Sequence, residues 1–179
     1  SLVVIHFIPF PAVKATNPND SQGRPMAELF RQPAFAVAAL AAALGYGVMN
    51  LLMAATPLAM QVCGFAFEDA ALVLQWHVIG MFAPGFITGH LIKRFGTLQV
   101  MAVGVVLNFI CIVIALSGIE LHQFLLSSFL LGVGWNFLFT GSTTLSLSTY
   151  TPAEKDKAQA ALNFCIFGTM AVTSFASGA

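Results

Sequence analysis

The sequence predicts an all-α fold, a polytopic transmembrane helical bundle, and two observations lead to that prediction. Hydrophobic residues make up 58% of the 179 residues, charged residues make up 8%, and the mean hydropathy is +0.87. This composition leaves too few charges to cover a water-soluble surface. Apolar runs of about 20 residues, the length that crosses a bilayer as a helix, alternate with polar turns. The formal net charge is zero, which argues against nucleic acid as a partner, because phosphate binding requires a basic surface.

The chain begins with a short apolar segment and a polar linker. Residues 1–10 are too few to span a bilayer, and we interpret them as the end of a preceding transmembrane helix. They lack the basic start and the small-residue cleavage site of a secretory signal. Residues 11–33 contain turn-forming prolines and asparagines together with Lys14, Arg24 and Arg31, which predicts a linker between membrane segments.

Residues 34–179 predict one bundle of membrane-spanning helices. Pro84 should kink the second span near its middle. The turn before the last span carries a capping box, Thr151 with Glu154, which marks a helix start. The last span reaches residue 179 without a closing charge, so we expect the sequence to be truncated at both ends. The five expected spans are 34–56, 70–92, 98–117, 122–147 and 158–179.

Small and polar residues recur on single faces of the spans. Gly85 and Gly89 lie one turn apart, so they predict a face that a neighbouring helix approaches closely. The fourth span carries a polar stripe whose spacing places its members on one face of a helix. This stripe either lines a pore or supplies interhelical hydrogen bonds. Its members are Gly132, Asn136, Thr140 and Thr143.

His77 is, Tyr46 aside, the titratable side chain that lies well inside a complete span. An ionisable residue at that depth is costly to place and usually faces the bundle interior or a water-filled cavity. His77 is therefore a candidate proton carrier or substrate hydrogen-bond donor. The alternative for His77 is a neutral histidine that is hydrogen-bonded to a neighbouring helix. The alternative for the other candidate residues is a role in helix packing. The predicted substrate or proton pathway comprises His77, Asn50, Tyr46, Asn136, Thr140 and Asn163.

The cations predict the orientation of the spans. All seven Lys and Arg residues fall on one side of an alternating topology, whereas the loops on the other side carry only the acidic Glu68, Asp69 and Glu120. Cytoplasmic loops hold the excess of Lys and Arg, so the positive side is inside. The predicted cytoplasmic segments are 11–33, 93–97 and 148–157.

A turn bracketed by glycines follows the second span. It carries Gly89, Lys93, Arg94 and Gly96. This spacing resembles the cytoplasmic signature that transporters of the major facilitator superfamily carry between their second and third helices and, in weaker form, between the eighth and ninth. The family pattern has Asp where this sequence has Lys93, which points to the weaker second copy.

The resemblance implies the remaining assignments. The chain would belong to the second half of a twelve-helix fold, comprising the end of helix 6 and helices 7 to 11, with the linker joining the two halves. Members of this family move a small solute by alternating access about a site between their halves. The implied partners are a small-molecule substrate, with proton coupling as an option, the lipid bilayer and the missing N-terminal half of the same chain. The implied location is the bacterial cytoplasmic membrane.

The alternative is a membrane protein that does not transport, either an intramembrane enzyme or a sensor that uses the helices as a scaffold. An enzyme needs a catalytic constellation, and the usual metal and nucleophile motifs are missing from the sequence. His77 and His90 lie about 20 Å apart along a helix and cannot share a metal. Cys63, Cys111 and Cys165 are widely spaced and form no metal motif. We therefore predict a transporter with no enzymatic activity, no metal and no cofactor.

Overall fold

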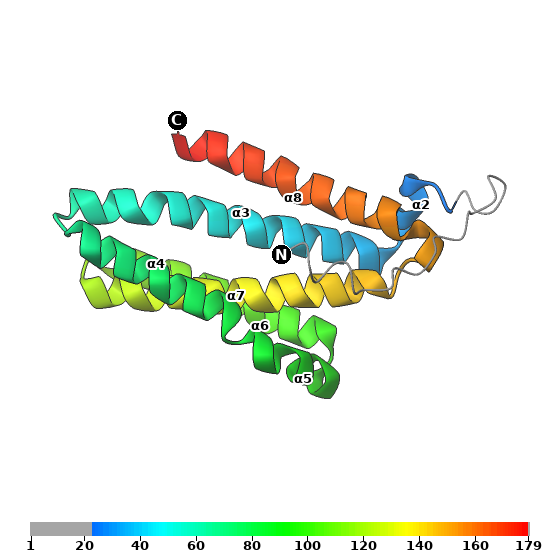
Figure 1. The fold of residues 1–179 in the computed structure, drawn as a ribbon, viewed down its shortest axis with the longest axis horizontal. Helices are drawn as coiled ribbons and strands as arrows, with labels where there is room; N and C mark the ends of the chain where they lie inside the picture. Colours follow the sequence, from blue (N-terminus) through cyan, green and yellow to red (C-terminus); the bar gives the residue numbers. More distant parts are fainter. Residues whose placement is uncertain (1–22, 179) are drawn as a thin grey trace, which may run out of the picture.

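The computed structural model describes residues 23–178, which form helices joined by short turns (Figure 1). This part of the chain contains no β-strand, which confirms the all-α fold class. The segment 1–10 and the linker up to residue 22 lie outside the described residues. The helices are α2 (Met26–Arg31), α3 (Pro33–Val62), α4 (Phe67–Phe82), α5 (Gly85–Phe95), α6 (Thr97–Ser117), α7 (Leu121–Leu147), the 3-10 helix η1 (Pro152–Glu154) and α8 (Lys155–Gly178).

Four helical segments are long and apolar enough to cross a membrane: α3, α6, α7 and the continuous η1–α8 segment. The α4–α5 pair makes a fifth span if its two helices, which meet at a bend of 40°, are counted together. The bend lies at Ala83 and Pro84, between the two helices. A proline lacks the backbone N–H that an uninterrupted helix requires. The kink predicted at Pro84 is found as this 40° bend, where α4 ends and α5 begins.

α3 is longer than the sequence predicted. We expected the first span to end at Thr56, but the helix continues to Val62 with Pro57 inside it. A proline lacks the N–H that would bond to the carbonyl oxygen four residues earlier, here that of Met53. The Thr56 hydroxyl donates to a different carbonyl oxygen, that of Leu52, at 2.6 Å, and so does not replace this bond. Pro57 thus removes one bond of the hydrogen-bond ladder without ending the helix.

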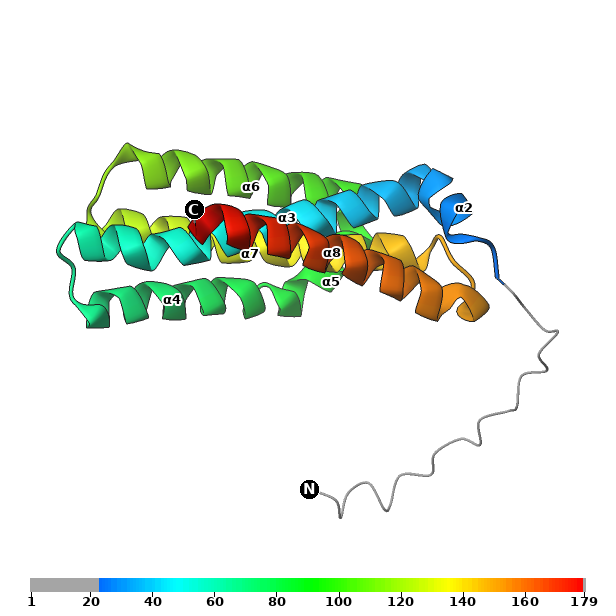
Figure 2. The same cartoon turned by 90° about the horizontal axis from the view of Figure 1, so that it is seen from above.

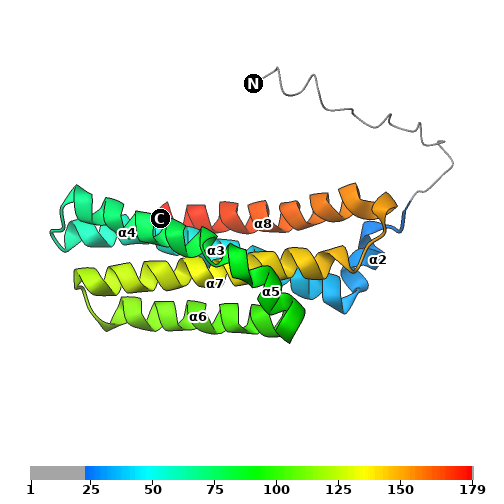
Figure 3. The same cartoon turned by 60° about the horizontal axis from the view of Figure 1, so that its bottom comes forward.

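α7 forms the centre of the bundle. α6 packs along one side of α7 and α4 along another, while α3 packs against both α7 and α8 (Figure 2; Figure 3). In the most apolar stretch of α7, 56% of the residues are buried, compared with 11% in η1–α8. α8 thus contacts the bundle mainly through α3, which lies between α8 and α4 in the view of Figure 1.

α4 and α7 cross closely at two glycines. A Cβ atom added to Gly132 would collide with the carbonyl oxygen of His77, and one added to Gly80 would collide with that of Phe129. Both obstacles are backbone atoms, which cannot move aside as a flexible side chain can. The two glycines therefore allow α4 and α7 to pack with their backbones in contact.

The close approach that we predicted at Gly85 and Gly89 is not found within residues 23–178. A Cβ atom on Gly89 would have nothing within 4 Å, and one on Gly85 would only touch the Asn136 side chain at 3.5 Å. The bend at Pro84 explains this difference, because α5 leaves the direction of α4 before it reaches Gly89.

An ion pair holds Arg24 against the turn between α7 and α8. Glu154 is 2% exposed, and its carboxylate accepts hydrogen bonds from the Arg24 side chain at 2.7 and 2.9 Å. The Arg24 backbone N–H donates to the same carboxylate at 2.9 Å. The Thr151 N–H and hydroxyl add further donors, which confirms the predicted capping box. The hydrogen bond to Glu154 raises the pKa of the Arg24 guanidinium above its ordinary value.

α2 reaches the same corner of the bundle through apolar contacts. Leu29 is fully buried there, in a cluster of apolar side chains from α3 and α8. The cluster holds the start of α8 against the start of α3, and both helices then continue toward the pocket described below. The buried residues packed with Leu29 are Phe35, Ala39, Ala158, Ala161 and Leu162.

Candidate functional site

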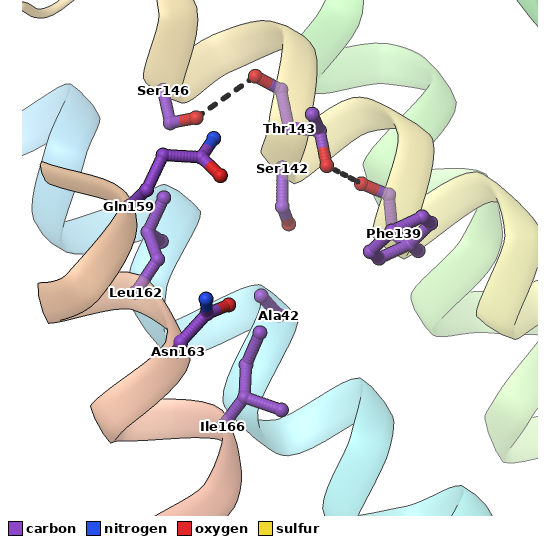
Figure 4. Close-up of a pocket in the computed structure, with 9 residues that line it drawn as sticks. All are labelled: Ala42, Phe139, Ser142, Thr143, Ser146, Gln159, Leu162, Asn163 and Ile166. Atoms are coloured by element: carbon purple, nitrogen blue, oxygen red, sulfur yellow. Dashed lines mark hydrogen bonds between the residues drawn. The ribbon is translucent and has the colours of Figure 1, made fainter. Parts of the chain in front are cut away.

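A small pocket lies between α3, α7 and α8, in the part of the bundle nearest the α7–α8 turn (Figure 4). Its volume is about 150 Å³. α7 supplies three hydroxyl groups and an aromatic ring, α8 supplies two amides, and apolar side chains complete the wall. The lining residues are Ala42, Phe139, Ser142, Thr143, Ser146, Gln159, Leu162, Asn163 and Ile166.

The three hydroxyl groups differ in how they are bonded. Thr143 donates to the Phe139 carbonyl oxygen at 2.9 Å, and Ser146 donates to the Thr143 carbonyl oxygen at 2.8 Å (Figure 4). Their hydrogens are used by the helix, so their oxygens can only accept from a ligand. Ser142 is 1% exposed, and its oxygen is buried without a hydrogen-bond partner among the described residues. Its hydroxyl is therefore an unpaired donor in the pocket wall, covered by its neighbours in this conformation.

Gln159 and Asn163 approach these hydroxyls from α8 (Figure 4). They lie one turn apart, so both project from the same face of the helix. Both are exposed, and neither amide makes a hydrogen bond to another residue within the described range. An amide both donates and accepts. The pocket therefore offers both kinds of hydrogen-bonding group, and all nine of its lining residues are uncharged.

An aromatic cluster borders the pocket along α7. The Trp135 and Phe139 rings stack with centroids 5.0 Å apart and an interplanar angle of 6°. The Tyr46 ring of α3 meets both edge-on, at centroid distances of 5.2 and 5.9 Å. Phe139 belongs to the cluster and to the pocket wall, and it is 37% exposed. A planar ligand would thus find an aromatic surface beside hydrogen-bonding groups.

Asn50 lies in a separate polar group that joins α3 to α8. Its Nδ2 atom is 2.9 Å from the Ser174 hydroxyl oxygen, 3.0 Å from that of Thr173 and 3.4 Å from the Met170 carbonyl oxygen. An amide nitrogen carries two hydrogens, so it bonds to two of these three acceptors at a time. Asn50 therefore connects two helices outside the pocket.

Asn136 bonds to the break between α4 and α5. Its Nδ2 atom donates to the Met81 carbonyl oxygen at 2.8 Å, and its Oδ1 atom lies 2.7 Å from the Thr88 hydroxyl oxygen. Thr88 Oγ1 lies equally close to the Pro84 carbonyl oxygen, so one hydrogen serves two acceptors. This geometry favours the interhelical interpretation of the polar stripe at Asn136. A place for Asn136 in the substrate pathway stays a prediction.

His77 faces α7 and is 3% exposed. Its Nδ1 atom lies 2.9 Å from the carbonyl oxygen of Ser128. A carbonyl oxygen only accepts, so Nδ1 carries the hydrogen of the neutral ring. The other nitrogen, Nε2, is buried without a partner among the described residues. A second proton on Nε2 would therefore be an unpaired buried donor in this conformation, and a carrier role requires a partner that reaches it.

The predicted proton pathway through His77 has a direct test in the full-length protein. Gln does not titrate, so His77→Gln is expected to flatten the pH dependence of uptake at unchanged membrane abundance. His90→Gln serves as the matched control, because His90 is exposed on α5. An unchanged pH profile in His77→Gln would limit His77 to joining α4 to α7.

The structure brings together only part of the predicted pathway. Asn163 lines the pocket, and Tyr46 reaches it through Phe139. Thr140 is half-buried on α7, where its carbonyl oxygen accepts the Thr144 hydroxyl at 2.8 Å. Within residues 23–178, no three His, Cys, Asp or Glu side chains are placed to hold a metal ion. The other predicted residues form bonds elsewhere: Asn50, Asn136 and His77.

Sequence reasoning missed most of the pocket wall on α7. Phe139, Ser142, Thr143 and Ser146 follow the spacing of one helix face. The polar stripe predicted from the sequence lies on a neighbouring face of the helix and includes only Thr143 of these four. The run of hydroxyl residues near the end of the fourth span is the sequence feature that marks the pocket.

The predicted loop signature lies at the end of α5. Lys93 and Arg94 occupy its last turn, where cations interact favourably with the helix dipole. Gly96 has φ of 93°, in the left-handed region that glycine adopts without strain. Backbone geometry therefore explains Gly96. A wider role for Gly89, Lys93 and Arg94 stays a prediction.

Comparisons with known proteins find relatives along the whole chain. The family model described as Major Facilitator Superfamily matches residues 1–178. The riboflavin transporter RfnT of Brucella anthropi is 42% identical over 99% of this chain and 45% of its own length. Two uncharacterized MFS-type transporters of Bacillus subtilis, YddS and YdeG, are 32% and 29% identical over 63% and 66% of this chain. The chain covers 26% and 28% of those two proteins, so it spans less than half of each relative. No solved structure matches the chain.

Proposed function

The chain belongs to the major facilitator superfamily, and we propose that it forms part of the second half of a secondary transporter. The full-length protein would move a small uncharged solute across the bacterial inner membrane by alternating access. Its missing N-terminal half would supply the other wall of the path. The protein would act by binding and moving its solute, without catalysing a reaction.

The pocket between α3, α7 and α8 is the observation that carries this proposal. Hydroxyls and amides are expensive to place in a membrane interior, and they usually mark a pathway or an interhelical bond. The Ser142 hydroxyl and the Gln159 and Asn163 amides have no partner among the described residues. The described helices therefore leave these groups unpaired, and a solute in the pocket would pair with them.

The proposed substrate is riboflavin. The relative with 42% identity over nearly the whole chain is named a riboflavin transporter. Riboflavin combines a planar ring system with an uncharged polyhydroxyl chain. The exposed Phe139 ring, packed against Trp135 and Tyr46, suits the ring system, and the adjoining pocket suits the chain.

The proposed orientation places the α7–α8 turn and the end of α5 in the cytoplasm. The cations of segments 93–97 and 148–157 support this orientation through the positive-inside rule. The pocket would then lie in the cytoplasmic part of the membrane, and proton coupling would have to come from residues outside its uncharged wall.

Uptake into liposomes tests the proposed function. Purified full-length protein should accumulate labelled riboflavin with saturable kinetics, and an imposed pH gradient should change the rate if transport is proton-coupled. Protein-free liposomes measure leakage. Uptake no faster than leakage, with or without the gradient, would contradict the proposed function.

A further inference from the structure

The pocket wall carries a charge preference of its own. All nine lining residues are uncharged, and three of them are hydroxyl residues of α7. A phosphate ester carries a charge of about −1.5 to −2 at pH 7. Moving such a charge into a membrane pocket without a cation is strongly unfavourable. This side of the pocket therefore favours an uncharged ligand.

The hydrogen-bonding groups of the pocket wall also favour a ligand that carries hydroxyl groups. Ser142 offers a donor, Thr143 and Ser146 offer acceptors, and Asn163 offers both. A hydroxyl group both donates and accepts, so a polyhydroxyl chain can pair with several of these groups together. A site of this kind rejects an analogue that lacks the hydroxyls, because its own polar groups then stay unpaired.

The size of the pocket limits how much of a solute it can hold. Pockets that enclose a drug-sized ligand measure about 300–1,000 Å³, whereas this one measures about 150 Å³. Only one end of a flavin fits inside it. The exposed part of Phe139 lies at the pocket wall, where the ring system of the same molecule would continue.

We propose that this pocket is a subsite for the uncharged polyhydroxyl chain of a flavin, with Ser142 as a specificity-determining residue. The protein would accept riboflavin, reject its phosphate esters, and bind less tightly a flavin ring without the chain. This inference rests on the proposed function, since it assumes that a flavin is the solute.

Three flavins separate the features of this subsite. Riboflavin carries the polyhydroxyl chain, lumiflavin has the ring with a methyl group in place of the chain, and flavin mononucleotide carries the chain with a terminal phosphate. Their binding to purified full-length protein can be followed through the change in flavin fluorescence. Riboflavin is expected to bind most tightly, with lumiflavin and flavin mononucleotide each at least about 10-fold weaker.

Ser142→Ala tests the role of the unpaired hydroxyl. Losing one hydrogen bond between uncharged groups should weaken riboflavin binding by about 3- to 10-fold, while lumiflavin binding stays unchanged. The melting temperature should stay the same or rise, because the variant removes a buried hydroxyl that has no partner. Ser127→Ala is the matched control: Ser127 is buried on the same helix, but its hydroxyl donates to the Phe124 carbonyl oxygen at 3.2 Å. It should leave the ranking of the flavins unchanged.

The outcomes distinguish this inference from the proposed function. If the wild-type protein binds none of the three flavins, the proposed substrate is contradicted, and the inference with it. If riboflavin binds but flavin mononucleotide binds equally well, the charge preference alone is contradicted. If Ser142→Ala weakens riboflavin and lumiflavin equally, or weakens neither, Ser142 does not contact the chain and the subsite is overturned.

Discussion

Gly132→Leu is expected to remove most of the folded protein from the membrane. A Cβ atom at this position would already collide with the His77 carbonyl oxygen and lie 2.8 Å from the Met81 nitrogen. A larger side chain must therefore push α4 away from α7. Overpacking costs about 1–3 kcal/mol, and more where only backbone could yield. The same displacement would stretch the hydrogen bonds from His77 to Ser128 and from Asn136 to Met81.

The membrane abundance of the full-length protein measures this effect. Gly89→Leu is the matched control, because a Cβ atom there would have nothing within 4 Å among the described residues. We expect several-fold less folded Gly132→Leu than Gly89→Leu after gel filtration of solubilised membranes. Equal amounts of the two variants would show that α4 and α7 do not cross at Gly132.

Asn136→Leu is expected to destabilise the protein far more than Asn108→Leu. Both asparagines are 7% exposed, and leucine resembles asparagine in shape. Asn136 donates to Met81 and accepts from Thr88, whereas the Asn108 Oδ1 atom has no partner among the described residues. Removing Asn136 leaves the Met81 carbonyl group unpaired beside the break, at a cost of about 1–3 kcal/mol. Removing Asn108 should cost little or nothing.

Thermal unfolding of the purified full-length variants compares these two positions. The Asn136→Leu protein should melt several degrees lower than the wild type, and the Asn108→Leu protein at the same temperature or higher. Similar losses in both variants would mean that burial alone, and not the hydrogen bonds to the break, makes Asn136 important.

The fold class could be predicted from the sequence because its determinants are local. Each long apolar run specifies a span, and Pro84 and the Thr151–Glu154 capping box mark a break and a helix start where the structure has them. The predicted end of α3 was wrong because we expected the helix to stop before Pro57. Whether a proline ends a helix depends on the contacts around it, and the sequence does not reveal those contacts.

The crossing of α4 and α7 could not be predicted because it depends on two helices together. Gly80 and Gly132 each lack a second glycine one turn away in their own span, and only their contact across the interface makes them important. Gly85 and Gly89 had the more recognisable spacing within one helix. The bend at Pro84 points them elsewhere, and its direction is a property of the packed bundle.

Only some of the predicted pathway residues line the pocket, and the sequence could not show which ones, because this too depends on two helices together. A polar residue in a span is bonded either to a neighbouring helix or to a solute, and the sequence does not contain the neighbour. Asn50 and Asn136 find partners on α8 and α4, whereas Asn163 finds none within residues 23–178. Ser142 was overlooked because a serine in a membrane helix usually bonds to its own backbone, as Ser146 does.

Protection of a cysteine at position 163 would test the central claim most directly. Asn163→Cys places a thiol in the pocket wall, and Cys111 and Cys165 are replaced by alanine so that they do not react. Native Cys63, exposed in the turn after α3, is kept as the internal control. Gln159→Cys provides a second position on the same wall. Each variant is first shown to take up riboflavin.

If riboflavin occupies this pocket during transport, saturating riboflavin should slow alkylation at position 163 or 159 several-fold in membrane vesicles and leave Cys63 unaffected. If alkylation proceeds equally fast with and without riboflavin at both pocket positions, in protein that transports riboflavin, the pocket between α3, α7 and α8 is not the substrate site.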